Sequence, residues 1–164
     1  MRVKLQNEER DILTKKRSTI KIFSEIKVFL KDLLPKISPA TINEGNFNSI
    51  EGGVIKYVNY CKELNADGKR THTGRFIGSL VADFHRNMLK GGIFIYPKTS
   101  DKPEGQLRLI YECNPIALIA KNSNGQATSL EDDILNITPL SIHQRTAFVV
   151  GSKKMVDKLL AFCN

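Results

Sequence analysis

Apolar residues recur along the chain at two spacings, one typical of helices and one of strands. Residues 79–90 carry them at helical spacing, and the next residues, Gly91 and Gly92, are typical of a helix end. Residues 93–97 are an apolar run closed by a proline, which predicts a short buried strand. Similar patterns predict helices over 49–64, 115–125 and 153–163, strands over 106–111 and 147–152, and a polar loop over 65–74.

Strands alternating with helices predict an α/β fold in which flanking helices cover a layered mixed sheet. At 164 residues the chain is long enough for one domain with a substantial core. No apolar run approaches the roughly 18 residues that a membrane span requires. The first residues contain no apolar signal-peptide core, so we expect a cytoplasmic protein. Three cysteines without metal-ligand spacing are typical of unpaired thiols.

Residues 1–40 differ from the rest of the chain, and we interpret them as a basic leader that precedes a domain at 41–164. They hold ten Lys/Arg and five Asp/Glu, a charge of +5 out of a total of +8. Their apolar residues recur at helical spacing until Pro35 and are Phe23, Ile26, Leu30, Leu33 and Leu34. A basic surface attracts nucleic acid or phosphorylated metabolites, but no nucleic-acid recognition motif is present.

Glu112 stands between the predicted strand Leu107–Tyr111 and the helix that begins at Pro115. Asn114 is a plausible N-cap, and proline suits the first helical position. The carboxylate therefore lies near the positive end of a helix dipole. The residues alone leave open whether it complements that dipole or faces a cation or a substrate.

Three local features suit phosphate binding. The corner "NEGNF" (43–47) offers backbone N–H groups and the Asn43 amide. Arg75 precedes a predicted helix, and Tyr96 ends a strand, the edge at which α/β folds usually bind ligands. The histidines are scattered, and the adjacent carboxylates of Asp132 and Asp133 are typical of an acidic turn.

Four stretches together resemble the class I fructose-1,6-bisphosphatases: "NEGNF", "GRFIGSLVADFHRNMLKGGIFIYP", "GQLRLIYECNPIALIA" and "IHQR". The resemblance covers about residues 41–163 and only the C-terminal part of a full-length member. It implies the C-terminal half of a sugar-phosphatase fold. It also implies Mg²⁺-dependent hydrolysis of the 1-phosphate of fructose 1,6-bisphosphate, a step of gluconeogenesis. Sedoheptulose bisphosphate stays open as a substrate.

The resemblance also implies roles for individual residues. Asn43 matches a contact to the 6-phosphate, and the Tyr96 hydroxyl matches a phosphate donor. Arg75 matches an arginine that reaches the 6-phosphate site of a neighbouring subunit. Glu112 matches a metal-ligating carboxylate. Other matched substrate-binding positions are Phe76, Ser79, Leu80, Phe94, Ile95 and Gln106.

The sequence departs from the family's pattern in three places. Phe76 stands where members usually have a tyrosine, and Gln106 where they usually have a lysine. The other metal carboxylates belong to an N-terminal "Asp-Pro-x-Asp-Gly-Ser-Ser" motif, which is absent from the 164 residues. We therefore expect little or no activity from the isolated chain, because one carboxylate cannot organise a multi-metal site.

Three hypotheses follow. In the first, another polypeptide supplies the missing N-terminal half, and the active phosphatase binds its sugar phosphate and Mg²⁺ jointly. In the second, the chain is a truncated, inactive relative that serves as a binding module or is a gene remnant, and it exposes an apolar face. In the third, the least favoured, it binds nucleic acid through its charge, with steep salt dependence. Family members are tetramers, which leaves a homo-oligomer open.

Overall fold

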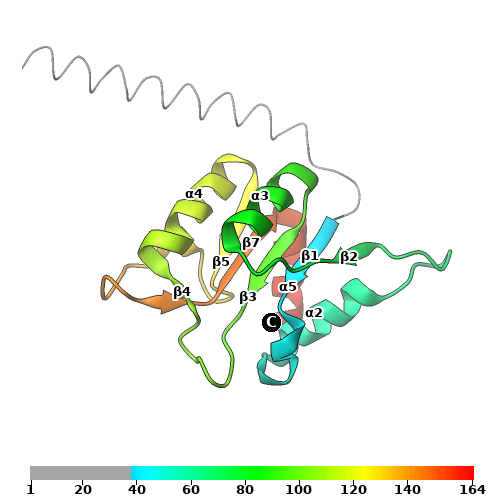
Figure 1. Cartoon of the computed structure of the whole chain (residues 1–164), viewed down its shortest axis with the longest axis horizontal. Coiled ribbons are helices and arrows are strands. Elements are labelled where there is room, and N and C mark those ends of the chain that lie inside the picture. Colours follow the sequence, from blue (N-terminus) through cyan, green and yellow to red (C-terminus); the bar gives the residue numbers. More distant parts are fainter. Residues whose placement is uncertain (1–37) are drawn as a thin grey trace, which may run out of the picture.

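The computed structural model describes residues 38–164, which fold around one five-stranded mixed sheet in the order β2-β1-β3-β7-β5 (Figure 1). The strands β1, β2 and β3 run parallel, whereas β7 pairs antiparallel with both β3 and β5. The strand bounds are Ser38–Ile42 (β1), His72–Gly74 (β2), Ile93–Tyr96 (β3), Gly125–Thr128 (β5) and Phe148–Ser152 (β7). The predicted helical stripe of residues 23–34 lies outside the described residues.

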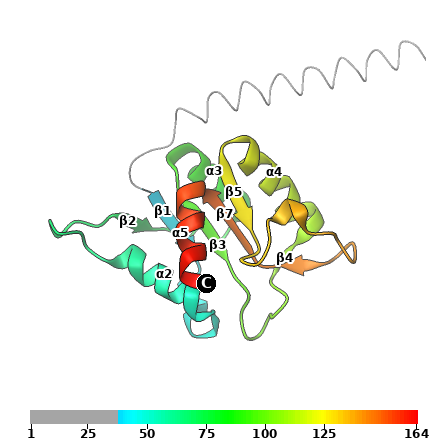
Figure 2. The ribbon, with the colours of Figure 1, turned by 180° about the vertical axis from the view of Figure 1, so that it is seen from behind.

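Helices cover both faces of the sheet. Figure 1 shows α3 and α4 over one face, and Figure 2 shows α2 and α5 over the other. Their bounds are Gly52–Lys62 (α2), Leu80–Lys90 (α3), Asn114–Asn122 (α4) and Lys153–Cys163 (α5). Two short 3₁₀ helices, η1 (Glu44–Ser49) and η3 (Ile134–Asn136), follow β1 and β5 respectively. This layered α/β architecture confirms the fold class that the sequence predicts.

The core divides into two clusters because successive side chains of a strand point to opposite faces of a sheet. Ile93 and Ile95 of β3 pack with α2 and α5 in one cluster. Phe94 of the same strand packs with Phe148 of β7 and with α3 and α4 in the other. All four side chains are almost fully buried, so β3 is fixed from both faces. Its C-terminal end therefore offers a rigid place for a binding site.

The predicted strand over 107–111 is largely wrong. Only Leu107–Arg108 is extended, as β4, which pairs with β6 (Arg145–Thr146) in a separate two-stranded ribbon. Residues Leu109–Cys113 form a π-helical turn, η2, that runs directly into α4. Asn114 is consequently not an N-cap but a helical residue with φ −60° and ψ −47°. The Glu112 carboxylate stabilises this turn by accepting the backbone N–H of Arg108 at 2.7 Å.

Other boundaries also differ from the sequence-based expectation. Gly125 begins β5 and does not end the preceding helix, which stops at Asn122. By contrast, α3 begins one residue later than predicted and ends at Lys90 as predicted; its C-cap, Gly91, has a φ of 71°, in the left-handed region that favours glycine.

None of the three cysteines forms a disulfide. Cys61 and Cys113 are buried in the two core clusters. Burial, with a smaller contribution from the charge of Glu112, raises the pKa of the Cys113 thiol to about 12. Across residues 38–164, the helices are too short or too polar for any of them to cross a membrane.

Candidate functional site

The candidate site lies where the parallel strands end. Since β1, β2 and β3 share one direction, their C-terminal ends meet at the same edge of the sheet. Asn43 follows β1, Arg75 follows β2 and Tyr96 ends β3. Ile42, the last residue of β1, pairs with Ile95 of β3. The residues that follow them, Asn43 and Tyr96, therefore lie side by side. The resemblance assigned both to phosphate, and the strand register brings them together.

A small cavity of about 10 Å³ lies at this edge. Four of the predicted site residues line it, namely Asn43, Ile95, Tyr96 and Gln106. Its remaining walls are Ile42, Asn46, Ile50, Pro97 and Thr99. The cavity has room for only about one water, but the amide and hydroxyl groups around it can hydrogen-bond a phosphate or a sugar at its mouth.

The Asn43 side chain is oriented by the turn that follows it. Asn43 is the N-cap of η1, and its Oδ1 accepts the backbone N–H of Gly45 at 3.1 Å. Because the oxygen is engaged in this way, the Nδ2 group keeps its two N–H donors for other partners. An amide that presents donors suits an anion, in keeping with the prediction that the "NEGNF" corner binds phosphate.

The Tyr96 ring is held by its own strand. It stacks on Phe94, with ring centroids 5.7 Å apart and planes 15° apart. Phe94 is 2% exposed and Ile95 is fully buried, whereas Tyr96 is half-buried. Of the predicted strand residues, therefore, Phe94 positions its neighbour and Ile95 forms part of the cavity wall. The Tyr96 hydroxyl is the group of this strand that is suited to donate to a ligand.

Gln106 reaches the cavity from the segment that precedes β4. Its side-chain Oε1 accepts the ammonium N–H of Lys102 at 3.1 Å. Its backbone carbonyl accepts a hydrogen bond from the Arg145 guanidinium on β6. Two cations thus flank the position at which the family usually has a lysine, and neither was singled out from the sequence.

The residues between β2 and α3 do not line the cavity. The backbone N–H of Arg75 donates to the Ala40 carbonyl at 3.2 Å, which extends the parallel pairing, while its side chain is exposed. Phe76 is also exposed, at 40%. Ser79 precedes α3 without a side-chain capping bond, and Leu80 packs against the core cluster under α3 and α4. Their predicted substrate roles stay predictions.

Glu112 lies four residues beyond β4, in the turn η2, and is half-buried. Within residues 38–164, no three His, Cys, Asp or Glu side chains gather in a way that could hold a metal ion. Mg²⁺ demands near-octahedral oxygen coordination, so a single carboxylate without further protein ligands in that range does not fit it. The described residues therefore do not by themselves form the magnesium site that the resemblance implies.

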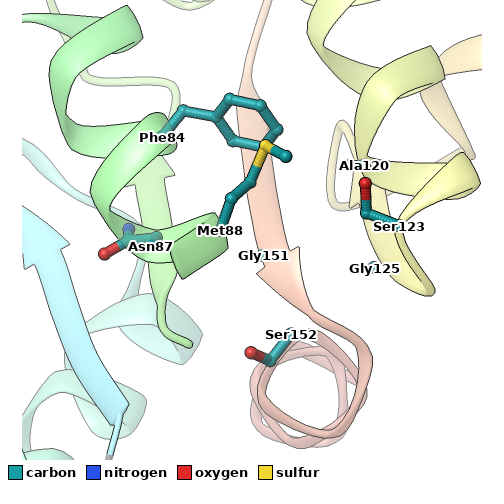
Figure 3. Close-up of a pocket in the computed structure, with 8 residues that line it drawn as sticks. All are labelled: Phe84, Asn87, Met88, Ala120, Ser123, Gly125, Gly151 and Ser152. Atoms are coloured by element: carbon teal, nitrogen blue, oxygen red, sulfur yellow. The ribbon is translucent and has the colours of Figure 1, made fainter. Parts of the chain in front are cut away.

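A second cavity, of about 30 Å³, lies between α3 and α4 (Figure 3). Figure 3 shows Phe84 and Met88 pointing from α3 into it, above Gly151 of β7, whereas the Asn87 amide turns toward β1 and donates to Thr41. Gly151 pairs with Ile93, the first residue of β3, so this cavity lies at the strand end opposite the candidate site. Its size suits about one ordered water rather than a metabolite.

Sequence reasoning missed Asn46, Thr99 and Lys102. Asn46 lies within the "NEGNF" corner, so a signal for it was present. Thr99 and Lys102 belong to the turn after β3, whose composition indicates only a loop. They reach the site because residue Ile50 forms a bridge with Thr99, a long-range contact that no local pattern reveals.

Comparisons with known proteins identify the family of this chain. The family model described as the C-terminal domain of fructose-1,6-bisphosphatase matches residues 35–164. The fold is similar to a crystal structure of Leishmania major fructose-1,6-bisphosphatase in holo form, with a TM-score of 0.74 and 39% sequence identity. That match covers 80% of this chain but only 40% of the Leishmania chain. Through its C-terminal domain, the chain belongs to the fructose-1,6-bisphosphatase family.

Proposed function

We propose that this chain is the sugar-phosphate-binding C-terminal part of a fructose-1,6-bisphosphatase. The observation that carries the proposal is the meeting of Asn43, Tyr96 and Gln106 around one cavity at the end of parallel strands. The complete enzyme would hydrolyse the 1-phosphate of fructose 1,6-bisphosphate with Mg²⁺, as a step of gluconeogenesis in the cytoplasm. Sedoheptulose bisphosphate remains an alternative substrate.

The isolated chain would hydrolyse its substrate little or not at all. Glu112 is one carboxylate, and Mg²⁺-assisted phosphoryl transfer needs a site that holds the metal against both protein and phosphate oxygens. The further carboxylates would come from a polypeptide segment that corresponds to the unmatched part of the Leishmania chain.

An exposed apolar surface is expected of half a fold, whether or not a second polypeptide covers it. Tyr111 is exposed immediately before Glu112, and its hydroxyl hydrogen-bonds His143 in the loop before β6. Within that loop Leu140 is 90% exposed and Ile142 is 65% exposed. Apolar side chains gathered at this level of exposure are typical of a surface that another polypeptide covers.

The alternative is an inactive relative that binds sugar phosphate without a partner that completes its site. Phe76 favours it, because phenylalanine lacks the hydroxyl of the family's usual tyrosine. Both proposals predict sugar-phosphate binding, and they differ in whether an added N-terminal half creates activity.

Replacing Tyr96 with phenylalanine tests the binding site. A hydrogen bond to a charged group contributes roughly 1.5–3 kcal/mol, so Tyr96→Phe should weaken binding of fructose 1,6-bisphosphate about 10-fold to 150-fold. Isothermal titration calorimetry of the full chain measures the dissociation constant. Tyr60→Phe is the matched control, since Tyr60 packs on Tyr57 and Phe162 away from the cavity. Equal affinities for the two variants would contradict the proposed site.

A further inference from the structure

We propose that Lys102 supplies the positive charge of the sugar-phosphate site that Gln106 cannot provide. The inference rests on the proposed function, because it concerns the same cavity. Lys102 lies four residues before Gln106, on the turn between β3 and β4. Its Nζ donates to Gln106 Oε1 at 3.1 Å, which places an ammonium group next to a side chain that lines the cavity.

The backbone of this turn is held firmly beside the site. The Lys102 N–H donates to the Thr99 carbonyl at 3.0 Å, and its own carbonyl accepts the N–H of Gly105 at 3.0 Å. The N–H of Ser100 donates to the Ser49 carbonyl at 3.0 Å, which ties the turn to the end of η1. The same η1 begins at the Asn43 cap, so Lys102 and Asn43 stand on segments that are bonded to each other.

The charge of Lys102 is also available to a ligand. Within the described part of the chain, no carboxylate lies within ion-pair distance of its ammonium group. Lys98, on the same turn, differs in this respect because it forms an ion pair with Glu131 at 2.7 Å. The exposed Lys102 side chain has a long flexible stem, so its ammonium can leave Gln106 and reach a phosphate oxygen at the cavity mouth.

Gln106 then takes a different part in binding from a lysine. Its amide oxygen accepts from Lys102, and its amide nitrogen keeps two donors for a sugar hydroxyl or a phosphate oxygen. The site would then present a cation from Lys102 and an amide from Gln106, where family members usually have one lysine. Specificity for a phosphorylated ligand would be retained, although the residue at position 106 is neutral.

Exchange of charges between positions 102 and 106 tests this inference. Calorimetric titration with fructose 1,6-bisphosphate would compare the unaltered full chain with Lys102→Met, Gln106→Lys and the double variant. We expect Lys102→Met to weaken binding roughly tenfold or more, and Gln106→Lys in that background to restore it. Gln106→Lys alone should gain less than it gains in the Lys102→Met background, because the two cations would serve one ligand charge.

Lys98→Met is the matched control, since it removes the same charge from the same turn, and it should change affinity less than about threefold. Titration with unphosphorylated fructose should show no difference between the lysine variants. If the unaltered chain binds and Lys102→Met equals Lys98→Met, the inference is wrong and the proposed function stands. If the unaltered chain binds no fructose 1,6-bisphosphate at millimolar concentration, the proposed function fails and this inference fails with it.

Discussion

Phe148→Ala is expected to lower the free energy of unfolding by about 3–5 kcal/mol, since a phenylalanine truncated in a core loses burial and leaves a cavity. Phe148 is fully buried in β7, between β3 and β5, where it packs with Phe94 and Leu109. Single domains have total stabilities of about 5–15 kcal/mol, so this loss is a substantial fraction of the whole.

Urea unfolding followed by circular dichroism measures this loss. The matched control is Phe76→Ala, which removes the same side chain from a position that is 40% exposed. It should change stability by less than about 1 kcal/mol. Equal losses in the two variants would show that the cluster beneath α3 and α4 does not stabilise the sheet as described.

Gly105→Ala is expected to cost about 2–5 kcal/mol, from a strained backbone and from overpacking together. Gly105 has a φ of 92°, a conformation that residues with a side chain rarely adopt. A Cβ atom there would stand 2.1 Å from the backbone carbonyl carbon of Thr146. The ribbon formed by β4 and β6 would have to separate, which would displace Gln106 and Glu112.

Gly68→Ala separates the two contributions. Gly68 has a comparable φ of 71°, but no atom lies within 4 Å of an added Cβ. It should therefore show only the backbone strain, about 1–2 kcal/mol. Thermal unfolding of both variants, with calorimetric titration of fructose 1,6-bisphosphate, measures the difference. A Gly105→Ala chain as stable as Gly68→Ala, with unchanged affinity, would contradict the close packing of the ribbon.

Elements with a strong local pattern could be predicted from the sequence. The helix α3 combines helically spaced apolar residues with a glycine at its end, and β3 is an apolar run closed by Pro97. The strand β5 has the sequence Gly-Gln-Ala-Thr, which shows no alternation, and it forms because β7 pairs along it. Its existence depends on a partner distant in sequence, so local propensity could not reveal it.

In the segment 107–111, by contrast, the local pattern predicts a strand that does not form over most of its length. Its residues, Leu-Arg-Leu-Ile-Tyr, are typical of a strand, yet most of the segment is helical. The tertiary structure overrides the propensity because the Glu112 carboxylate bonds to the Arg108 N–H, and Leu109 and Cys113 are buried under α4. Interpreting Glu112 as the end of a strand was therefore wrong, although its position beside the start of α4 was predicted correctly.

The candidate site was predicted in part. Family resemblance identified Asn43, Tyr96 and Gln106; the register of β1 and β3 brings the first two together, and all three line one cavity. Composition and spacing alone indicated only a glycine-containing corner and a strand end. Neither the family resemblance nor the composition pointed to Lys102, because its proposed role depends on a side-chain contact with Gln106 across a turn.

We propose that this chain binds a sugar bisphosphate and that residues 38–164 lack the further carboxylates needed to hydrolyse it. The most direct measurement is phosphate release from fructose 1,6-bisphosphate by the purified 164-residue chain with Mg²⁺, beside Glu112→Gln. We expect binding of the substrate by calorimetry and no release above background from either protein. Release by the unaltered chain that disappears in Glu112→Gln would contradict it, because the chain would then build a working metal site by itself.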